Sequence, residues 1–159
     1  MKNLKFTLFF VFLFCFSKIN SQNNWTKIEP SSISKNKNTE RLSFPKDIGV
    51  YQTSFTAIKS KLQNAPSVLK AKNSQNIITI PNSKGVEEHF EIFEFSNFDS
   101  ELQQQFPEIR SYTGKGIDDK NATIRLSIDP RGMQAMVFRT DKENEFIESE
   151  LKTIKTDSL

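Results

Sequence analysis

Apolar residues in the segment 51–66 recur at the spacing of an α-helix. Four of them fall at i, i+4, i+7 and i+11: Tyr51, Phe55, Ile58 and Leu62. This stripe predicts an amphipathic helix whose apolar side packs on a core. Thr53 or Ser54 can cap the first turn of this helix, and Pro66 ends it.

Farther along the chain the apolar pattern changes to that of β-strands. The segments "IITI" (77–80) and "VEEHFEIFEF" (86–95) are rich in β-branched and aromatic residues and flank the turn sequence "PNSKG". From residue 123 to 129, apolar and polar side chains alternate, and the turn sequence "DPRG" (129–132) leads into a returning apolar segment, 133–138. Both patterns predict antiparallel β-hairpins.

The remaining segments complete the predicted fold. Asp99 can cap a short helix in which Leu102 and Phe106 lie four residues apart. The charged tail, 140–159, fits either a helix or a hairpin. We therefore predict an α+β fold in which antiparallel β-hairpins form a sheet, with one amphipathic helix and one short helix packed on it. The order of the strands is left open.

The N-terminus has the pattern of a secretory signal peptide. Lys2 and Lys5 precede a run of nine apolar residues, 8–16, which is followed by small and polar residues. As a helix this run extends about 14 Å, too short to cross a membrane, so a membrane anchor is the weaker interpretation. We expect cleavage near Ser21 and secretion through the periplasm to the cell surface or the medium, with no membrane association of the cleaved chain.

This assignment sets the expected organisation of the chain. Residues 1–21 form the signal peptide, and residues 22–46 form an extended lead-in whose Trp25 docks on the domain. Residues 47–139 form one α+β domain, which is within the usual size of a single domain. Residues 140–159 form the charged tail, which the prediction treats as truncated.

Charge and cysteine content narrow the functional classes. The chain has 22 Lys and Arg residues against 19 Asp and Glu residues, and the signal peptide alone holds Lys2, Lys5 and Lys18. The cleaved chain is therefore close to neutral, which gives no reason to expect nucleic acid as a partner. The only cysteine, Cys15, also leaves with the signal peptide, so thiol catalysis and disulfides are excluded. We expect a monomer without a cofactor.

The glycine-rich segment "RSYTGKGIDD" (110–119) is the first candidate for chemistry. It lacks the spacing of a P-loop and of a dinucleotide-binding loop, and two aspartates would repel a phosphate. The oxygen-bearing side chains of 119–123 resemble the start of a calcium loop, but Ile124 and Pro130 occupy positions where an EF-hand needs Gly and Glu. His89, the only histidine, lies among carboxylates and lacks a second histidine for a zinc hydrolase. We expect no catalytic residue.

The run "FPEIRSYTGKGIDDKNATIRLSIDPRGMQAMV" (106–137) resembles the N-terminal region of secreted, reprolysin-like zinc metallopeptidases of Gram-negative bacteria. The preceding hairpin and the helix at 51–62 are also similar to that family. The resemblance implies a non-catalytic, propeptide-like domain that assists the folding of a downstream protease domain or inhibits it. Its partner would be that metallopeptidase catalytic domain, in cis or in trans. The His-Glu-x-x-His zinc motif is absent from this chain. The resemblance therefore implies that the chain is a fragment or a stand-alone relative of the prodomain.

The resemblance also suggests how inhibition would work. A cysteine cannot bind the protease zinc, because the cleaved chain has none. A carboxylate can ligate zinc in its place, and we hypothesise that a flexible Gly-Lys-Gly arm presents Asp118 or Asp119 as a zinc-latching group. In the alternative interpretation, Asp118 caps a turn. The alternative function is a stand-alone secreted binding or adhesion module.

Overall fold

The computed structural model describes residues 25–29 and 48–149. It is a mixed α+β structure that is mostly β. Its two short strands are β1 (Trp25–Lys27) and β2 (Tyr51–Thr53), and its two helices are α2 (Phe55–Gln63) and α3 (Ser100–Gln105). The main sheet contains β3 (Ile77–Pro81), β4 (Glu87–Glu94), β5 (Arg110–Gly116), β6 (Thr123–Asp129), β7 (Gly132–Phe138) and β8 (Glu145–Glu148).

Several predictions for the termini lie outside the described residues. These are the signal peptide with its cleavage point near Ser21, most of the lead-in, and residues 150–159 of the tail. Within the described residues, no helix is long and apolar enough to cross a membrane.

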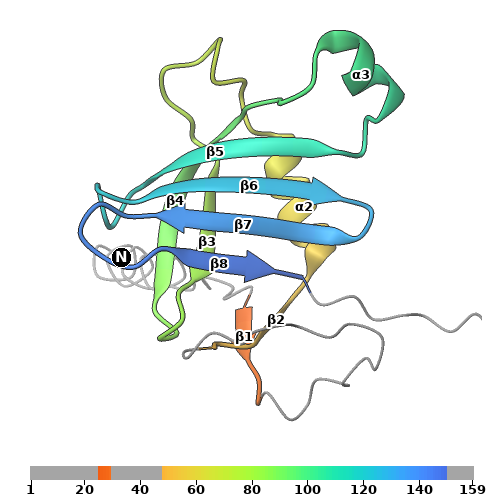
Figure 1. Cartoon of the computed structure of the whole chain (residues 1–159). Coiled ribbons are helices and arrows are strands. Elements are labelled where there is room, and N and C mark those ends of the chain that lie inside the picture. The colour runs from red at the N-terminus through yellow and green to blue at the C-terminus, as the bar shows by residue number, and fades with distance from the viewer. Residues whose placement is uncertain (1–24, 30–47, 150–159) are drawn as a thin grey trace, which may run out of the picture.

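The main sheet follows the order of the sequence, β3-β4-β5-β6-β7-β8, and every neighbouring pair is antiparallel. The sheet is curled (Figure 1). The axes of β5 to β8 are nearly aligned, β3 and β4 cross behind these four strands, and α2 also lies behind them. The two predicted hairpins correspond to β3–β4 and β6–β7 and are confirmed. Strand β5 connects them, and this meander is the strand order that the sequence left open.

The core lies on the concave face of this curled sheet. Every second residue of the strands points to it, as the registers Ile92↔Gly114↔Ile124↔Val137 show. Ile58 and Leu62 of α2 belong to the same buried cluster as these strand residues. The apolar stripe of the helix therefore supplies one side of the core.

The amphipathic helix is shorter at its start than predicted. Its first residue is Phe55, and the side chain of Ser54 caps it by accepting a hydrogen bond from the backbone N–H of Ala57. Ser54 is thus confirmed as the cap, but the assignment of Tyr51 to the helix is wrong. Tyr51 lies in β2, and its hydroxyl donates to the carbonyl of Asn82 in the β3–β4 turn. This tertiary contact, together with pairing to Lys27, outweighs the helical spacing.

The small sheet attaches the lead-in to the domain. The indole Nε1–H of Trp25 donates to the carbonyl oxygen of Thr79 at 2.6 Å, and the Trp25 ring packs against the core. The predicted docking of Trp25 is therefore confirmed. A partly buried indole contributes both apolar area and a donor, which explains why one residue can hold a short strand.

The sheet extends into the segment that was assigned to the tail. Strand β8 pairs antiparallel with β7, with Phe146 opposite Met136. The predicted domain boundary at residue 139 is therefore wrong, because the last sheet strand lies beyond it. For this segment the sequence left a helix and a hairpin open, and the β7–β8 pair shows that the hairpin is correct. The short helix α3 forms with Asp99 as its cap but buries none of its residues, so its packing on the sheet remains a prediction.

The Gly-Lys-Gly sequence is part of β5 and does not form a flexible arm. Gly114 points to the core, and a Cβ at this position would lie 2.5 Å from Ile92 Cδ1 and 2.7 Å from Ile124 Cγ2. Gly116 is also buried. Its missing side chain lets the backbone of Asp119 approach closely. The glycines are thus needed for packing, and the expectation that they make residues 114–116 flexible is wrong.

The first test concerns this packing. We expect Gly114→Ala to lower the free energy of unfolding by about 1 to 3 kcal/mol, because the methyl group has no space between two buried isoleucines. Lys115→Ala is the matched control, since its side chain on the same strand is exposed. Urea denaturation measures both variants, and equal stabilities would contradict this account of β5.

Candidate functional site

The two candidate aspartates follow β5 directly and point to different partners. One carboxylate oxygen of Asp118, Oδ2, accepts the backbone N–H of His89 at 2.7 Å and lies 2.8 Å from His89 Nδ1. A carboxylate only accepts hydrogen bonds, so Nδ1 carries the proton in this contact. The hydrogen bond from the backbone of His89, followed by that from its ring, lowers the pKa of Asp118. Both side chains are about half exposed.

Asp119 is bound more extensively. Its Oδ2 lies 3.0 Å from Arg139 Nη1 and 3.0 Å from Lys142 Nζ, and its Oδ1 accepts the backbone N–H of Asn121 at 3.0 Å. The hydrogen bond from Lys142 is the largest cause of its lowered pKa. Both oxygens are therefore engaged by donors of the domain itself.

Arg139 is the centre of an ion-pair network at the end of the sheet. Its side chain is only 3% exposed, and it contacts the carboxylates of Glu88, Asp119 and Glu145. Burial tends to lower the pKa of Arg139, but the hydrogen bond and charge of Glu88 and the charge of Glu145 raise it above its ordinary value. The network also holds the β3–β4 turn, because Ser83 donates to Glu145 through both its backbone N–H and its hydroxyl.

These contacts decide which chemistry the acidic residues can perform. The structure brings His89 and Asp118 together, and it brings Glu88, Asp119 and Glu145 together around a guanidinium. Within residues 25–29 and 48–149, no group of three or more His, Cys, Asp or Glu side chains is arranged to hold a metal ion. Arg139 and Lys142 both contact Oδ2 of Asp119, and Oδ1 accepts the backbone N–H of Asn121, so the carboxylate of the calcium-like pattern is already engaged.

A second candidate site lies on the convex face of the sheet, opposite the core. Arg125, Met136 and Phe146 are direct cross-strand neighbours on β6, β7 and β8. The guanidinium of Arg125 lies 5.0 Å from the ring centre of Phe95, a cation–π contact. These side chains line a shallow groove of about 300 Å³. Phe146 is 71% exposed, and Phe95 and Phe138 are also exposed.

The sequence pattern missed both Arg139 and this apolar surface. Arg139 follows the last residue of β7 and has no sequence neighbour that marks it as buried, since its partners come from residues 88, 119 and 145. A signal did exist for the surface. Met136, Phe138 and Phe146 occupy the positions of β7 and β8 that alternate with the core residues, where polar residues are usual.

Comparison of the chain with protein-family models, with curated proteins and with solved structures found no match. A functional proposal for this protein therefore depends on its own residues and on the sequence resemblance.

The ion-pair network leads to a stability test. We expect Arg139→Ala to lower the free energy of unfolding by about 3 to 5 kcal/mol, because three carboxylates would remain together without their buried cation. Arg131→Ala is the control, since Arg131 is 73% exposed and its ion-pair partner among the described residues is Asp129 only. Its loss should cost at most about 1 kcal/mol. Chemical denaturation measures both variants. Equal losses of unfolding free energy would contradict the role of Arg139 as the buried centre of the network.

The Asp118 contact predicts a dependence of stability on pH. A lowered carboxyl pKa stabilises the fold above the ordinary value of 3.8, and this contribution is lost as the pH falls through the lower folded-state pKa. When the pH is lowered below about 4, we expect the urea concentration at the unfolding midpoint to decrease for the wild type. The decrease should be smaller for Asp118→Asn, which lacks the titrating carboxyl group. Glu143→Gln, which changes an exposed carboxylate of the β7–β8 connection, serves as the control. A wild-type midpoint that does not change between about pH 5 and pH 2 would contradict the prediction.

Proposed function

We propose that this chain is a non-catalytic prodomain of a secreted, reprolysin-like zinc metallopeptidase, and that it assists the folding of the protease domain and inhibits it. The observation that carries the proposal is the resemblance of residues 106–137 to the N-terminal region of those enzymes. The convex groove supports it, because a prodomain needs a surface that binds its protease. The protein acts after secretion, as a monomer, with the catalytic domain as its partner in cis or in trans.

The composition of the convex face fits a protein partner. Exposed apolar groups gather on it, and Arg125 makes no hydrogen bond or ion pair with another described residue. Aromatic residues, Met and Arg are the types that protein interfaces favour. The matching protease surface would be apolar with a carboxylate opposite Arg125, which could pair with the guanidinium above Phe95.

The position of this face fits a partner in cis. Strand β8 forms one side of the groove through Phe146, and the described fold ends at Ser149, immediately after β8. A domain joined to the chain after β8 would be tethered to the strand that forms this side of the groove. Inhibition would then come mainly from covering the protease cleft.

The zinc-latching hypothesis now favours one of the two aspartates. Asp119 is mostly buried and bound to two cations, so releasing it would cost the domain several contacts. Asp118 is half exposed and held by His89 alone among the described residues. If a carboxylate of this domain reaches the protease zinc, we propose that it is Asp118.

The same surface also fits the alternative, a stand-alone secreted binding or adhesion module. In that case its partner is a protein other than a protease. The DNA downstream of the Leu159 codon distinguishes the two functions. An in-frame or neighbouring gene segment that encodes His-Glu-x-x-His supports the prodomain, and its absence from both places contradicts it.

The direct test adds the purified protein to the catalytic domain encoded there and measures proteolysis and refolding yield. We expect inhibition by the wild type and an inhibition constant at least about tenfold weaker for a Met136→Ala/Phe146→Ala variant, because the groove loses its apolar wall. Leu69→Ala is the control, since Leu69 is 90% exposed and lies outside the groove. Asp118→Ala should weaken inhibition further only if this carboxylate reaches the zinc. A wild-type protein that neither inhibits nor assists refolding would refute the proposal.

A further inference from the structure

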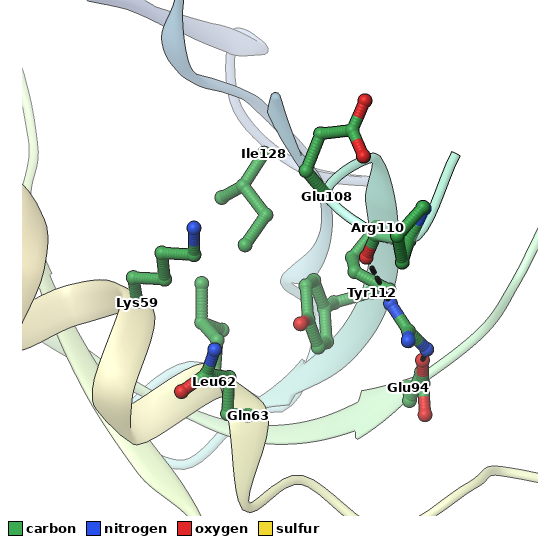
Figure 2. Close-up of a pocket in the computed structure, with 9 residues that line it drawn as sticks. Lys59, Leu62, Gln63, Glu94, Glu108, Arg110, Tyr112 and Ile128 are labelled. Carbon is green, nitrogen blue, oxygen red and sulfur yellow. Dashed lines mark hydrogen bonds and ion pairs between the residues drawn. The ribbon is translucent and has the colours of Figure 1, made fainter. Parts of the chain in front are cut away.

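A cavity of about 320 Å³ lies between the C-terminal half of α2 and the start of β5 (Figure 2). It is separate from the convex groove, because it opens into the concave side of the sheet. Its apolar wall consists of Leu62 from α2, Ile128 from β6 and the ring of Tyr112 from β5. All three residues are buried, so the wall is pre-formed and suits a short aliphatic group.

The hydroxyl of Tyr112 is an unpaired polar group in this cavity. Tyr112 is 3% exposed, yet its hydroxyl makes no hydrogen bond with another described residue. Burial, followed by the charge of Glu94, raises the pKa of Tyr112 to about 12. The hydroxyl therefore keeps its proton, and it is a donor that a ligand in the cavity can use.

Two further donors come from α2. Lys59 and Gln63 are one helical turn apart, so their side chains lie on the same side of α2, beside the cavity (Figure 2). Neither side chain has a hydrogen-bond or ion-pair partner among the described residues. Lys59 therefore adds to the cavity wall a positive charge that no ion pair engages.

The opposite wall limits how much negative charge the cavity can accept. Arg110 is paired with Glu94 at 2.6 Å, so these two charges cancel. Glu108 lies at the exposed side of the cavity and makes no ion pair within the described residues. Glu108 repels any anion, and it repels a dianion such as a phosphate about twice as strongly as a single carboxylate, so the charge of Lys59 favours the carboxylate.

We propose that this cavity binds a carboxylate with a short aliphatic body. The carboxylate accepts hydrogen bonds from Lys59 and Tyr112, and the aliphatic body packs on Leu62 and Ile128. Two sources carry this chemistry: the C-terminal residue of a peptide and a free short-chain acid. The site is distinct from the proposed protease interface, because Lys59, Leu62 and Ile128 do not line the convex groove, and Tyr112, which borders both, belongs to the buried core cluster.

The test measures binding to the purified protein by nuclear magnetic resonance titration with three probes. N-acetyl-leucine and hexanoate should shift the signals of Tyr112 and Leu62, and N-acetyl-leucinamide should bind at least about tenfold more weakly, because it lacks the charge that Lys59 attracts. Tighter binding of N-acetyl-leucine than of hexanoate assigns the site to peptide ends, and the reverse order assigns it to free acids. Equal binding of the acid and the amide would overturn the proposal.

Variants then locate the site. Tyr112→Phe removes only the hydroxyl, and Lys59→Met removes only the charge, so each should weaken N-acetyl-leucine binding about tenfold. Lys61→Met is the matched control, because Lys61 lies on the same helix but is exposed and does not line the cavity. Glu108→Gln should tighten binding. Binding that is unchanged in both Tyr112→Phe and Lys59→Met, or no signal change with either acid at millimolar concentration, would refute the site.

Discussion

The buried guanidinium of Arg139 is the contact on which the shape of this protein depends. It joins Glu88 of β4 to Glu145 of β8, although β5, β6 and β7 lie between these strands in the sheet. An uncurled sheet of this order would hold the two carboxylates far apart, since neighbouring strands are about 4.8 Å apart. The ion pairs can form only when the sheet curls, and once formed they hold that curvature. Removing such a cation strongly lowers the free energy of unfolding, because its carboxylates remain close together without a compensating charge.

The curl gives the sheet two faces with different properties. The concave face encloses the core with α2, and close packing is possible there because Gly114 leaves space for Ile92 and Ile124. The same face contains the cavity beside Tyr112, where the core does not fill the space between α2 and β5. The convex face carries Arg125, Met136 and Phe146 in one cross-strand row. Both proposed sites are therefore consequences of one curved sheet.

Several acidic side chains of this domain are engaged in ion pairs and hydrogen bonds that stabilise the fold. Glu88, Asp119 and Glu145 neutralise a buried arginine, Glu94 pairs with Arg110, and Asp118 receives two hydrogen bonds from His89. A catalytic carboxylate needs freedom to exchange protons or to bind a substrate, which these contacts restrict. Within residues 48–149, Arg125 on the apolar convex surface and Lys59 in the cavity form no hydrogen bond or ion pair through their side chains, and the Tyr112 hydroxyl also forms none. Such groups are available to contact a ligand or a partner, which is why we propose binding on both faces.

The sequence alone determined the local structure: the two hairpins with their turns, the Asp99 cap, a helix cap at Thr53 or Ser54, and the docking of Trp25. Each of these depends on neighbouring residues, on period-two alternation or on one large aromatic side chain. Only the tertiary structure decided that Tyr51 leaves the helix, that β8 joins the sheet, and that the glycines of "TGKG" serve packing. The same holds for the Arg139 network and the Tyr112 cavity, whose members are separated by many residues along the chain. Their contacts arise from the curvature of the sheet, and curvature is a property of all six strands together that no single segment encodes.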